Sequence, residues 1–89
     1  MTETMVLEKV RAFITENFLY MRPDFRLTDE DRLLERRILD SMAVMELITF
    51  LKDEFGVSVP ERDIREANLG SLKEIARYVV GARAGARGG

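Results

Sequence analysis

The sequence predicts an all-α fold: a small four-helix bundle of three main helices and one short helix, with a long loop between the first two. Apolar residues recur every three or four positions in three separate stretches, which is typical of amphipathic helices. Residues that start and stop helices flank these stretches, and no alternating pattern long enough for a strand occurs. A chain of 89 residues has room for one modest core, so we expect a single domain.

The first helix is predicted over residues 4–20, and a long connection over residues 22–39 follows it. Pro23 is expected to end the helix, because the residue before a proline avoids the α region. Four residues share one side of this helix: Val6, Val10, Phe13 and Asn17. Thr28–Asp31 resembles a capping box, which predicts a short helical turn within the connection. A connection of this length is more often functional than idle.

The second helix is predicted over residues 41–55, with Gly56 as its left-handed stop. Asp40 is placed to cap it, and Ser41 lies in its first turn. Free backbone N–H groups and a partial positive charge would favour a phosphate attached there. Helical spacing gives this helix a buried stripe of Val44, Leu47, Ile48, Leu51 and Phe55. The opposite, solvent side carries Met42, Met45, Glu46, Thr49 and Asp53.

A short helix over residues 61–67 and a final helix that begins at a capping box, Ser71–Glu74, complete the fold. Leu72, Ile75, Ala76 and Val79 recur at helical spacing in the final helix. No large apolar residue occurs from Gly81 onward. We therefore expect a folded domain over residues 1–80 and a disordered tail over residues 81–89.

The composition excludes several kinds of catalytic and metal-binding site. The chain has no cysteine and no histidine, which removes disulfides, thiolate metal sites and every histidine-containing triad. We expect no catalytic residue and no metal site. A formal net charge of -2 gives no support to nucleic-acid binding. With no apolar run of membrane length and no secretory signal, we expect a cytoplasmic protein that does not enter membranes.

The residues around Ser41 resemble those of the acyl carrier proteins and the related peptidyl and D-alanyl carrier proteins. The matching segments are Leu33-Leu34-Glu35, Ile38-Leu39-Asp40-Ser41-Met42, Glu46-Leu47 and Glu54-Phe55-Gly56-Val57. The Asp-Ser-Met core alone is a weak motif. The long loop before it, the Glu-Leu pair and the Phe-Gly stop make it specific, and the resemblance covers about residues 4–80.

The resemblance implies a free-standing phosphoprotein that carries 4′-phosphopantetheine on Ser41. A separate phosphopantetheinyl transferase, which brings Mg²⁺, would transfer the arm from coenzyme A, and an acyl or aminoacyl cargo would be held on it as a thioester. Asp40 would cap the helix and offer its carboxylate to the transferase. The remaining partners would be a loading enzyme and a downstream synthase or transferase, and we expect a monomer. Met42 and Met45 would give apolar docking contacts, and Glu46 and Asp53 acidic ones.

Two arginines depart from the family pattern. Arg36 and Arg37 stand where many carriers have a small residue and a glycine. If the second position needs a positive φ, Arg37 costs about 1 kcal/mol relative to glycine. Both arginines also place positive charge near Ser41, so we predict that they take part in docking. With the mild net charge, this favours a carrier of a specialised polyketide or nonribosomal peptide pathway over a housekeeping fatty-acid carrier.

Simpler interpretations remain at this point. Ser41 is also an ordinary residue for a helix start, and the acidic residues and arginines are also ordinary surface residues. Met42 and Met45 fit loose packing against the loop as well as partner contact. The main alternative is a helical interaction module that is never modified. A small enzyme would need a carboxylate or lysine mechanism, and no paired carboxylates suggest one.

Overall fold

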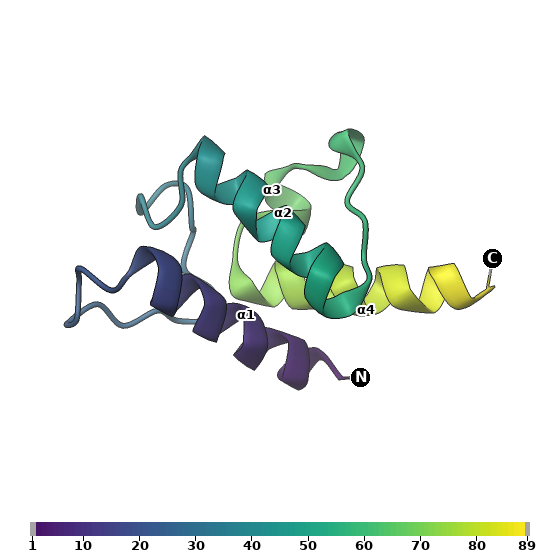
Figure 1. The fold of residues 1–89 in the computed structure, drawn as a ribbon, viewed down its shortest axis with the longest axis horizontal. Helices are drawn as coiled ribbons and strands as arrows, with labels where there is room; N and C mark the ends of the chain where they lie inside the picture. The colour runs from purple at the N-terminus through teal and green to yellow at the C-terminus, as the bar shows by residue number, and fades with distance from the viewer. Residues whose placement is uncertain (1, 89) are drawn as a thin grey trace.

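The predicted all-α fold is confirmed. The structure is a computed structural model that describes residues 2–88, with side chains described as far as Ala84. Within that part of the chain every regular element is helical (Figure 1). The elements are α1 (Glu3–Phe18), α2 (Ser41–Phe55), the 3₁₀ turn η1 (Glu61–Asp63), α3 (Glu66–Leu69) and α4 (Leu72–Gly88). None of the helices over residues 2–88 is both long and apolar enough to cross a bilayer.

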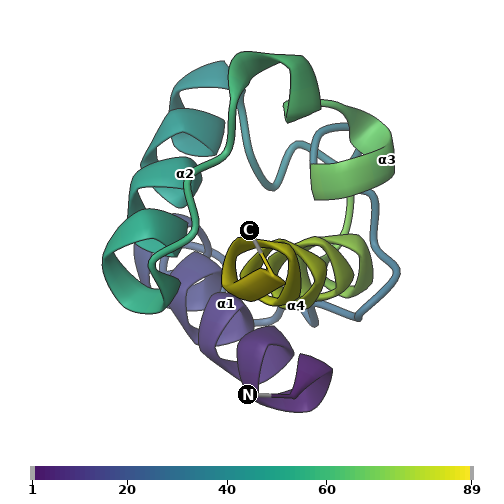
Figure 2. The same cartoon turned by 90° about the vertical axis from the view of Figure 1, so that its right-hand side faces the viewer.

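Helix α4 lies at the centre of the bundle. Viewed along its axis, α1 and α2 lie on one side of it and α3 on the other (Figure 2). All three long helices and the long connection contribute fully buried side chains to the core. The largest of these are Ile14, Leu33, Leu47, Leu51, Phe55, Leu72 and Ile75. The burial of this apolar surface is the main force that holds such short helices together.

Leu33 is the central anchor of the long connection. Its side chain is fully buried, and its N–H donates to the carbonyl of Gly70 at 2.9 Å. Its carbonyl accepts from the N–H groups of Ile38 and Leu39, at 2.9 and 3.0 Å. The residue therefore ties the connection to the turn before α4 and also fixes the turn that leads into α2.

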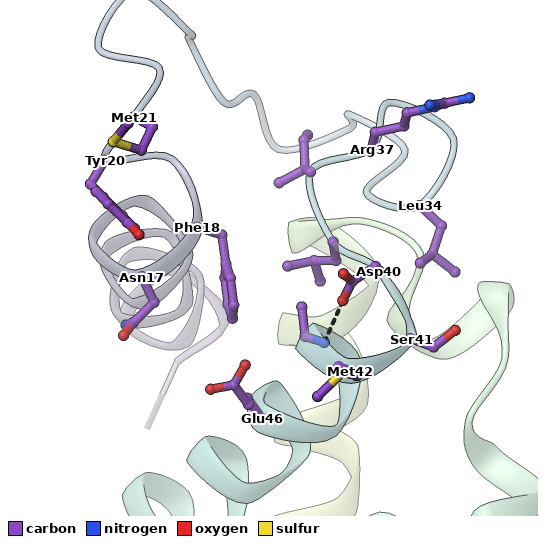
Figure 3. Close-up of a pocket in the computed structure, with 13 residues that line it drawn as sticks. Asn17, Phe18, Tyr20, Met21, Leu34, Arg37, Asp40, Ser41, Met42 and Glu46 are labelled. Atoms are coloured by element: carbon purple, nitrogen blue, oxygen red, sulfur yellow. Dashed lines mark hydrogen bonds between the residues drawn. The ribbon is translucent and has the colours of Figure 1, made fainter.

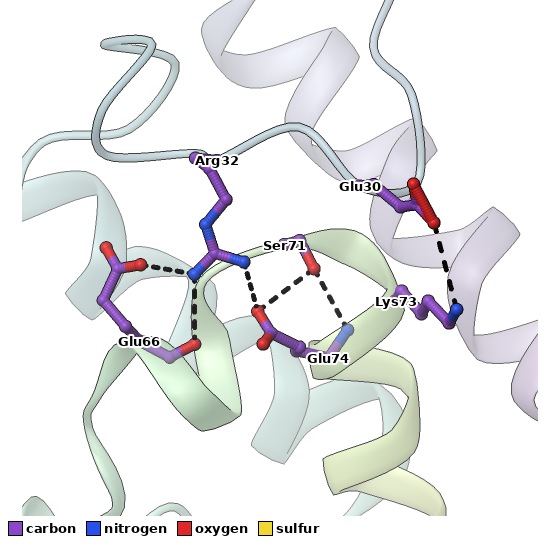
Figure 4. A network of polar contacts seen from close by, with 6 residues as sticks. All are labelled: Glu30, Arg32, Glu66, Ser71, Lys73 and Glu74. Atoms are coloured by element: carbon purple, nitrogen blue, oxygen red, sulfur yellow. Dashed lines mark hydrogen bonds and ion pairs between the residues drawn. The ribbon is translucent and has the colours of Figure 1, made fainter.

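Arg32 joins the same connection to α3 and α4 (Figure 4). Its guanidinium pairs with Glu66 and, at 2.8 Å, with Glu74. A Cβ at Gly70 would overlap with this guanidinium, so the absence of a side chain at Gly70 lets Arg32 cross the corner. Glu74 also takes part in the cap of α4: its N–H donates to Ser71 Oγ at 3.3 Å, which is the first bond of the predicted capping box, and the Ser71 hydroxyl donates to its carboxylate at 3.2 Å.

Helix α1 ends earlier than predicted, at Phe18 instead of residue 20. The chain turns at Leu19, whose side chain is buried, and the turn leaves Tyr20 and Met21 exposed. The helix therefore ends at Phe18, where the chain turns to bury Leu19, and not next to Pro23 as predicted. Asn17, expected on the apolar side, is exposed, and its amide donates to the Phe13 carbonyl at 2.8 Å.

The prediction of one short helix over residues 61–67 is wrong in detail, because the structure has two short elements there, η1 and α3. The backbone leaves the helical region at Ile64, with a ψ of 84°. Asp63 holds this break: its carbonyl accepts from the Asn68 amide at 2.9 Å and its carboxylate from the Tyr78 hydroxyl at 2.7 Å. Burial and then this hydrogen bond raise the pKa of Tyr78 to about 12.

The C-terminal segment differs from the expected disordered tail. Helix α4 continues to Gly88, and residue 89 lies outside the described part of the chain. Ala82 packs against the core and the Arg83 guanidinium donates to the Phe55 carbonyl at the end of α2. Alanine has the highest helix propensity, which favours continuation of the helix. The boundary between a folded domain that ends at residue 80 and a disordered tail over residues 81–89 stays a prediction.

We expect Gly81→Ala to raise the free energy of unfolding by about 0.5–1 kcal/mol, because alanine suits a helix interior better than glycine. A methyl group at Gly81 would have no neighbour within 4 Å. The matched control is Gly70→Ala, which should lower stability by about 1–3 kcal/mol through overlap with Arg32 and the Glu66 carbonyl. Urea denaturation measures both. Unchanged stability in Gly81→Ala would mean that α4 ends before residue 81 in solution.

Candidate functional site

Ser41 is the first residue of α2 and is exposed to solvent. Asp40 precedes it in an extended conformation, and its carboxylate accepts the N–H of Ala43 at 2.8 Å. This confirms the predicted cap. Since Ala43 is buried and Asp40 lies outside the helix, the cap fixes the first turn with the Ser41 side chain directed outward. The start of α2 lies at the end of the molecule opposite to the first turn of α1 and the far end of α4 (Figure 1).

A groove of about 790 Å³ borders Ser41 (Figure 3). One wall comes from the end of α1 and the turn after it, with Asn17, Phe18, Tyr20 and Met21. The other wall is the first turns of α2, with Met42 and Glu46, and the preceding loop closes one end with Leu34 and Arg37. The site therefore combines an accessible hydroxyl, the N-terminus of a long helix and large apolar side chains.

The solvent side of α2 is as predicted. Met42 and Met45 are 79% and 57% exposed, and Glu46 and Asp53 are exposed as well. The structure brings Met42 and Glu46 to the groove beside Ser41, whereas Met45 and Asp53 do not line it. Exposure of the two methionines is inconsistent with the interpretation that they pack under the long loop.

The sequence prediction missed the other wall of the groove. Tyr20 and Met21 are 69% and 78% exposed, so the apolar rim is larger than α2 alone provides. A first helix that continued to residue 20 would not present Tyr20 and Met21 as a separate wall. Met21 stands seven residues after Ile14 and therefore continues the helical repeat of Val6, Val10 and Ile14, so the pattern gave no signal of its exposure.

The loop before Asp40 ends in a Schellman motif with an arginine in the position that favours glycine. The N–H of Ile38 donates to the Leu33 carbonyl at 2.9 Å, and the N–H of Arg37 donates to the Leu34 carbonyl at 3.1 Å. Arg37 has a φ of 59°, the left-handed conformation that this motif requires. The positive φ considered for this position is therefore present, and it costs about 1 kcal/mol relative to glycine.

The two neighbouring arginines have different surroundings. Arg36 pairs with the Asp31 carboxylate at 2.6 Å, and its guanidinium lies 5.2 Å from the centre of the Phe25 ring. The pKa of the Asp31 carboxyl is lowered, mainly because it accepts a hydrogen bond from the N–H of Thr28. Burial raises this pKa, and the hydrogen bond from Arg36 lowers it further. The contacts of Arg36 are thus with other residues of the long connection, although its side chain is exposed. Only Arg37 borders the groove at Ser41.

A second, much smaller cavity of about 60 Å³ lies between α2 and α3. Leu34, Val44, Ile64 and Leu69 line it, and Leu34 also lines the groove beside Ser41. An apolar cavity of about 150 Å³ is needed to hold a molecule of the size of benzene. This cavity therefore has little room for a bound group unless the side chains around it move.

Comparison with known proteins identifies a family for most of the chain. Residues 18–79 match a family described as the phosphopantetheine attachment site. An acyl carrier protein from Campylobacter hominis is 31% identical over 74 residues, which cover 83% of this chain and 89% of that protein. An acyl carrier protein from Thermosynechococcus vestitus is 28% identical over 79 residues, which cover 89% of this chain and 93% of that protein.

We expect Arg37→Gly to raise the free energy of unfolding by up to about 1 kcal/mol, because glycine adopts the left-handed conformation without strain. Arg36→Gly serves as the control and should lower stability, since it removes the pair with Asp31 and relieves no strain. Chemical denaturation of both variants measures the difference. Equal losses in the two variants would contradict the assigned geometry.

Proposed function

The chain belongs to the acyl carrier protein family, and from this premise we propose that Ser41 is the residue that bears its prosthetic arm. The protein is a carrier with covalently attached 4′-phosphopantetheine and is not an enzyme. When bound, the arm supplies the thiol that this cysteine-free chain lacks, and the cargo is held on it as a thioester.

The surroundings of the three serines support the assignment to Ser41. Ser71 is only 3% exposed, and its hydroxyl is engaged with Glu74. Ser58 is exposed but lies in an extended segment between Val57 and Val59, away from any helix start. Ser41 alone among the serines combines exposure with the first position of a long helix. This is the observation that carries the proposal.

The start of α2 suits a phosphodiester. The N–H groups of the first turn precede the intrahelical hydrogen bonds, and the helix dipole gives this end a partial positive charge. Asp40 uses one carboxylate oxygen to cap the Ala43 N–H. The capped turn holds Ser41 in a fixed position, so the arm would extend from a rigid base into solvent.

The outer face of α2 is proposed as the main docking face for partner enzymes, through Met42, Met45, Glu46 and Asp53. The two methionines give adaptable apolar contacts, and the two acidic residues steer encounter with basic surfaces. The partners would be the phosphopantetheinyl transferase, a loading enzyme and a downstream synthase or transferase. Such interfaces are small and dissociate quickly.

The cargo is proposed to be an acyl or aminoacyl group of a specialised polyketide or nonribosomal peptide pathway. Two features support this. The net charge of -2 and the presence of Lys52 between the acidic residues of α2 make the docking face only mildly acidic. The cavity of about 60 Å³ between α2 and α3 offers little shelter for a long acyl chain. A short or polar cargo that stays in solvent fits this interior best.

We expect incubation with coenzyme A and a broad-specificity phosphopantetheinyl transferase to add one phosphopantetheinyl group to the protein, as measured by intact mass. Ser41→Ala should abolish the gain, because the accepting hydroxyl is gone. Ser58→Ala is the matched control and should keep it. A gain that persists in Ser41→Ala would place the arm elsewhere, and no gain with any of several transferases would favour the unmodified interaction module.

The cargo can be identified by mass analysis of the loaded protein purified from its source cells. We expect a single short acyl or aminoacyl group on the arm, since the interior cannot enclose a long chain as it stands. A series of fatty acyl groups that differ by two carbons would instead identify a fatty-acid carrier. That result would leave the assignment of Ser41 untouched.

A further inference from the structure

Arg37 combines an unfavourable backbone conformation with a guanidinium that makes no ion pair, hydrogen bond or aromatic contact with the described side chains. None of the ion pairs, hydrogen bonds or aromatic contacts among the described side chains involves its guanidinium, although Arg36 next to it makes both an ion pair and an aromatic contact. The left-handed backbone conformation, with its φ of 59°, adds a cost that glycine would avoid. The fold itself therefore gives no reason for an arginine at this position.

The residues that line the groove with Arg37 are of the types found at protein–protein interfaces. Tyr20, Met21 and Met42 are exposed and line the same groove as Arg37 and Ser41. Met42 lies next to Ser41, and Tyr20 and Met21 form the opposite wall (Figure 3). Aromatic residues, methionine and arginine are the residue types enriched at protein–protein interfaces. We call these four residues, Tyr20, Met21, Arg37 and Met42, the groove rim.

The transfer reaction determines which partner must cover the groove rim. Ser41 Oγ attacks the phosphorus next to pantetheine in coenzyme A, the bond to the leaving adenosine 3′,5′-bisphosphate breaks, and the serine proton passes to a base of the transferase. The transferase must therefore bring its substrate within bonding distance of Ser41 Oγ, and its surface must come against the residues around Ser41. Enzymes that act later reach the cargo at the far end of the arm and need no such close approach.

The direction of Arg37 indicates what it meets there. Its side chain extends away from Ser41, and so away from the place that the phosphates of coenzyme A must occupy (Figure 3). An enzyme that covers the start of α2 brings its own surface to this side chain, and the anionic side chains of a protein surface are carboxylates. We propose that the groove rim is the docking surface for the phosphopantetheinyl transferase and that Arg37 pairs with a carboxylate of that enzyme. This inference rests on the proposed attachment at Ser41.

The test is the kinetics of modification of the unmodified protein by the transferase from the same organism, with coenzyme A saturating and the carrier concentration varied. We expect Arg37→Ala to raise the KM for the carrier about tenfold at low salt, with kcat unchanged. Arg37→Lys should recover most of the loss, because it restores the charge. Arg36→Ala is the matched control and should stay within about twofold of the parent. Added salt should raise the KM of the parent protein more than that of Arg37→Ala.

Both arginine variants are compared at equal helical content by circular dichroism, and alanine keeps the same backbone cost at position 37. Equal KM values for the two alanine variants would overturn the proposal. A fall in kcat with KM unchanged would also overturn it, since Arg37 would then act on the phosphates and not on the transferase surface. If the parent protein and all variants fail to gain the arm, the assignment of Ser41 itself is wrong.

Discussion

The burial of Leu33 is the constraint on which the position of Ser41 depends. The side chain of Leu33 is inside the core, while its backbone N–H and carbonyl make hydrogen bonds with two different parts of the chain. One bond holds the corner before α4, and the other two close the turn that leads to Asp40 and α2. A long connection without regular structure would otherwise leave the start of α2 poorly placed. The functional helix is thus fixed from the loop that precedes it as well as by its own cap.

Local signals predicted α2 and the start of α4 accurately. The Asp40 cap, the left-handed Gly56 and the Ser71–Glu74 capping box each depend on residues within one turn of the chain, so the sequence contains them directly. The elements that were wrong depend on distant contacts. Asp63 meets Tyr78 from α4, so the break between η1 and α3 does not follow from local propensity.

The same division applies to the site. The exposure of Met42 and Glu46 followed from helical periodicity, because residues on one face of a helix share their surroundings. The different environments of Arg36 and Arg37 could not be predicted, since they depend on Asp31, Phe25 and the path of a single turn. The groove wall of Tyr20 and Met21 likewise required knowledge of where α1 ends.

The placement of Ser41 opposite to the first turn of α1 and the far end of α4 has a practical consequence (Figure 1). An affinity tag, a fluorescent reporter or a fused neighbouring protein joined at either of those ends would extend away from the serine. Immobilisation on a surface through them would likewise leave the serine facing solution. Such immobilised preparations are therefore suited to capturing enzymes that visit the carrier only briefly.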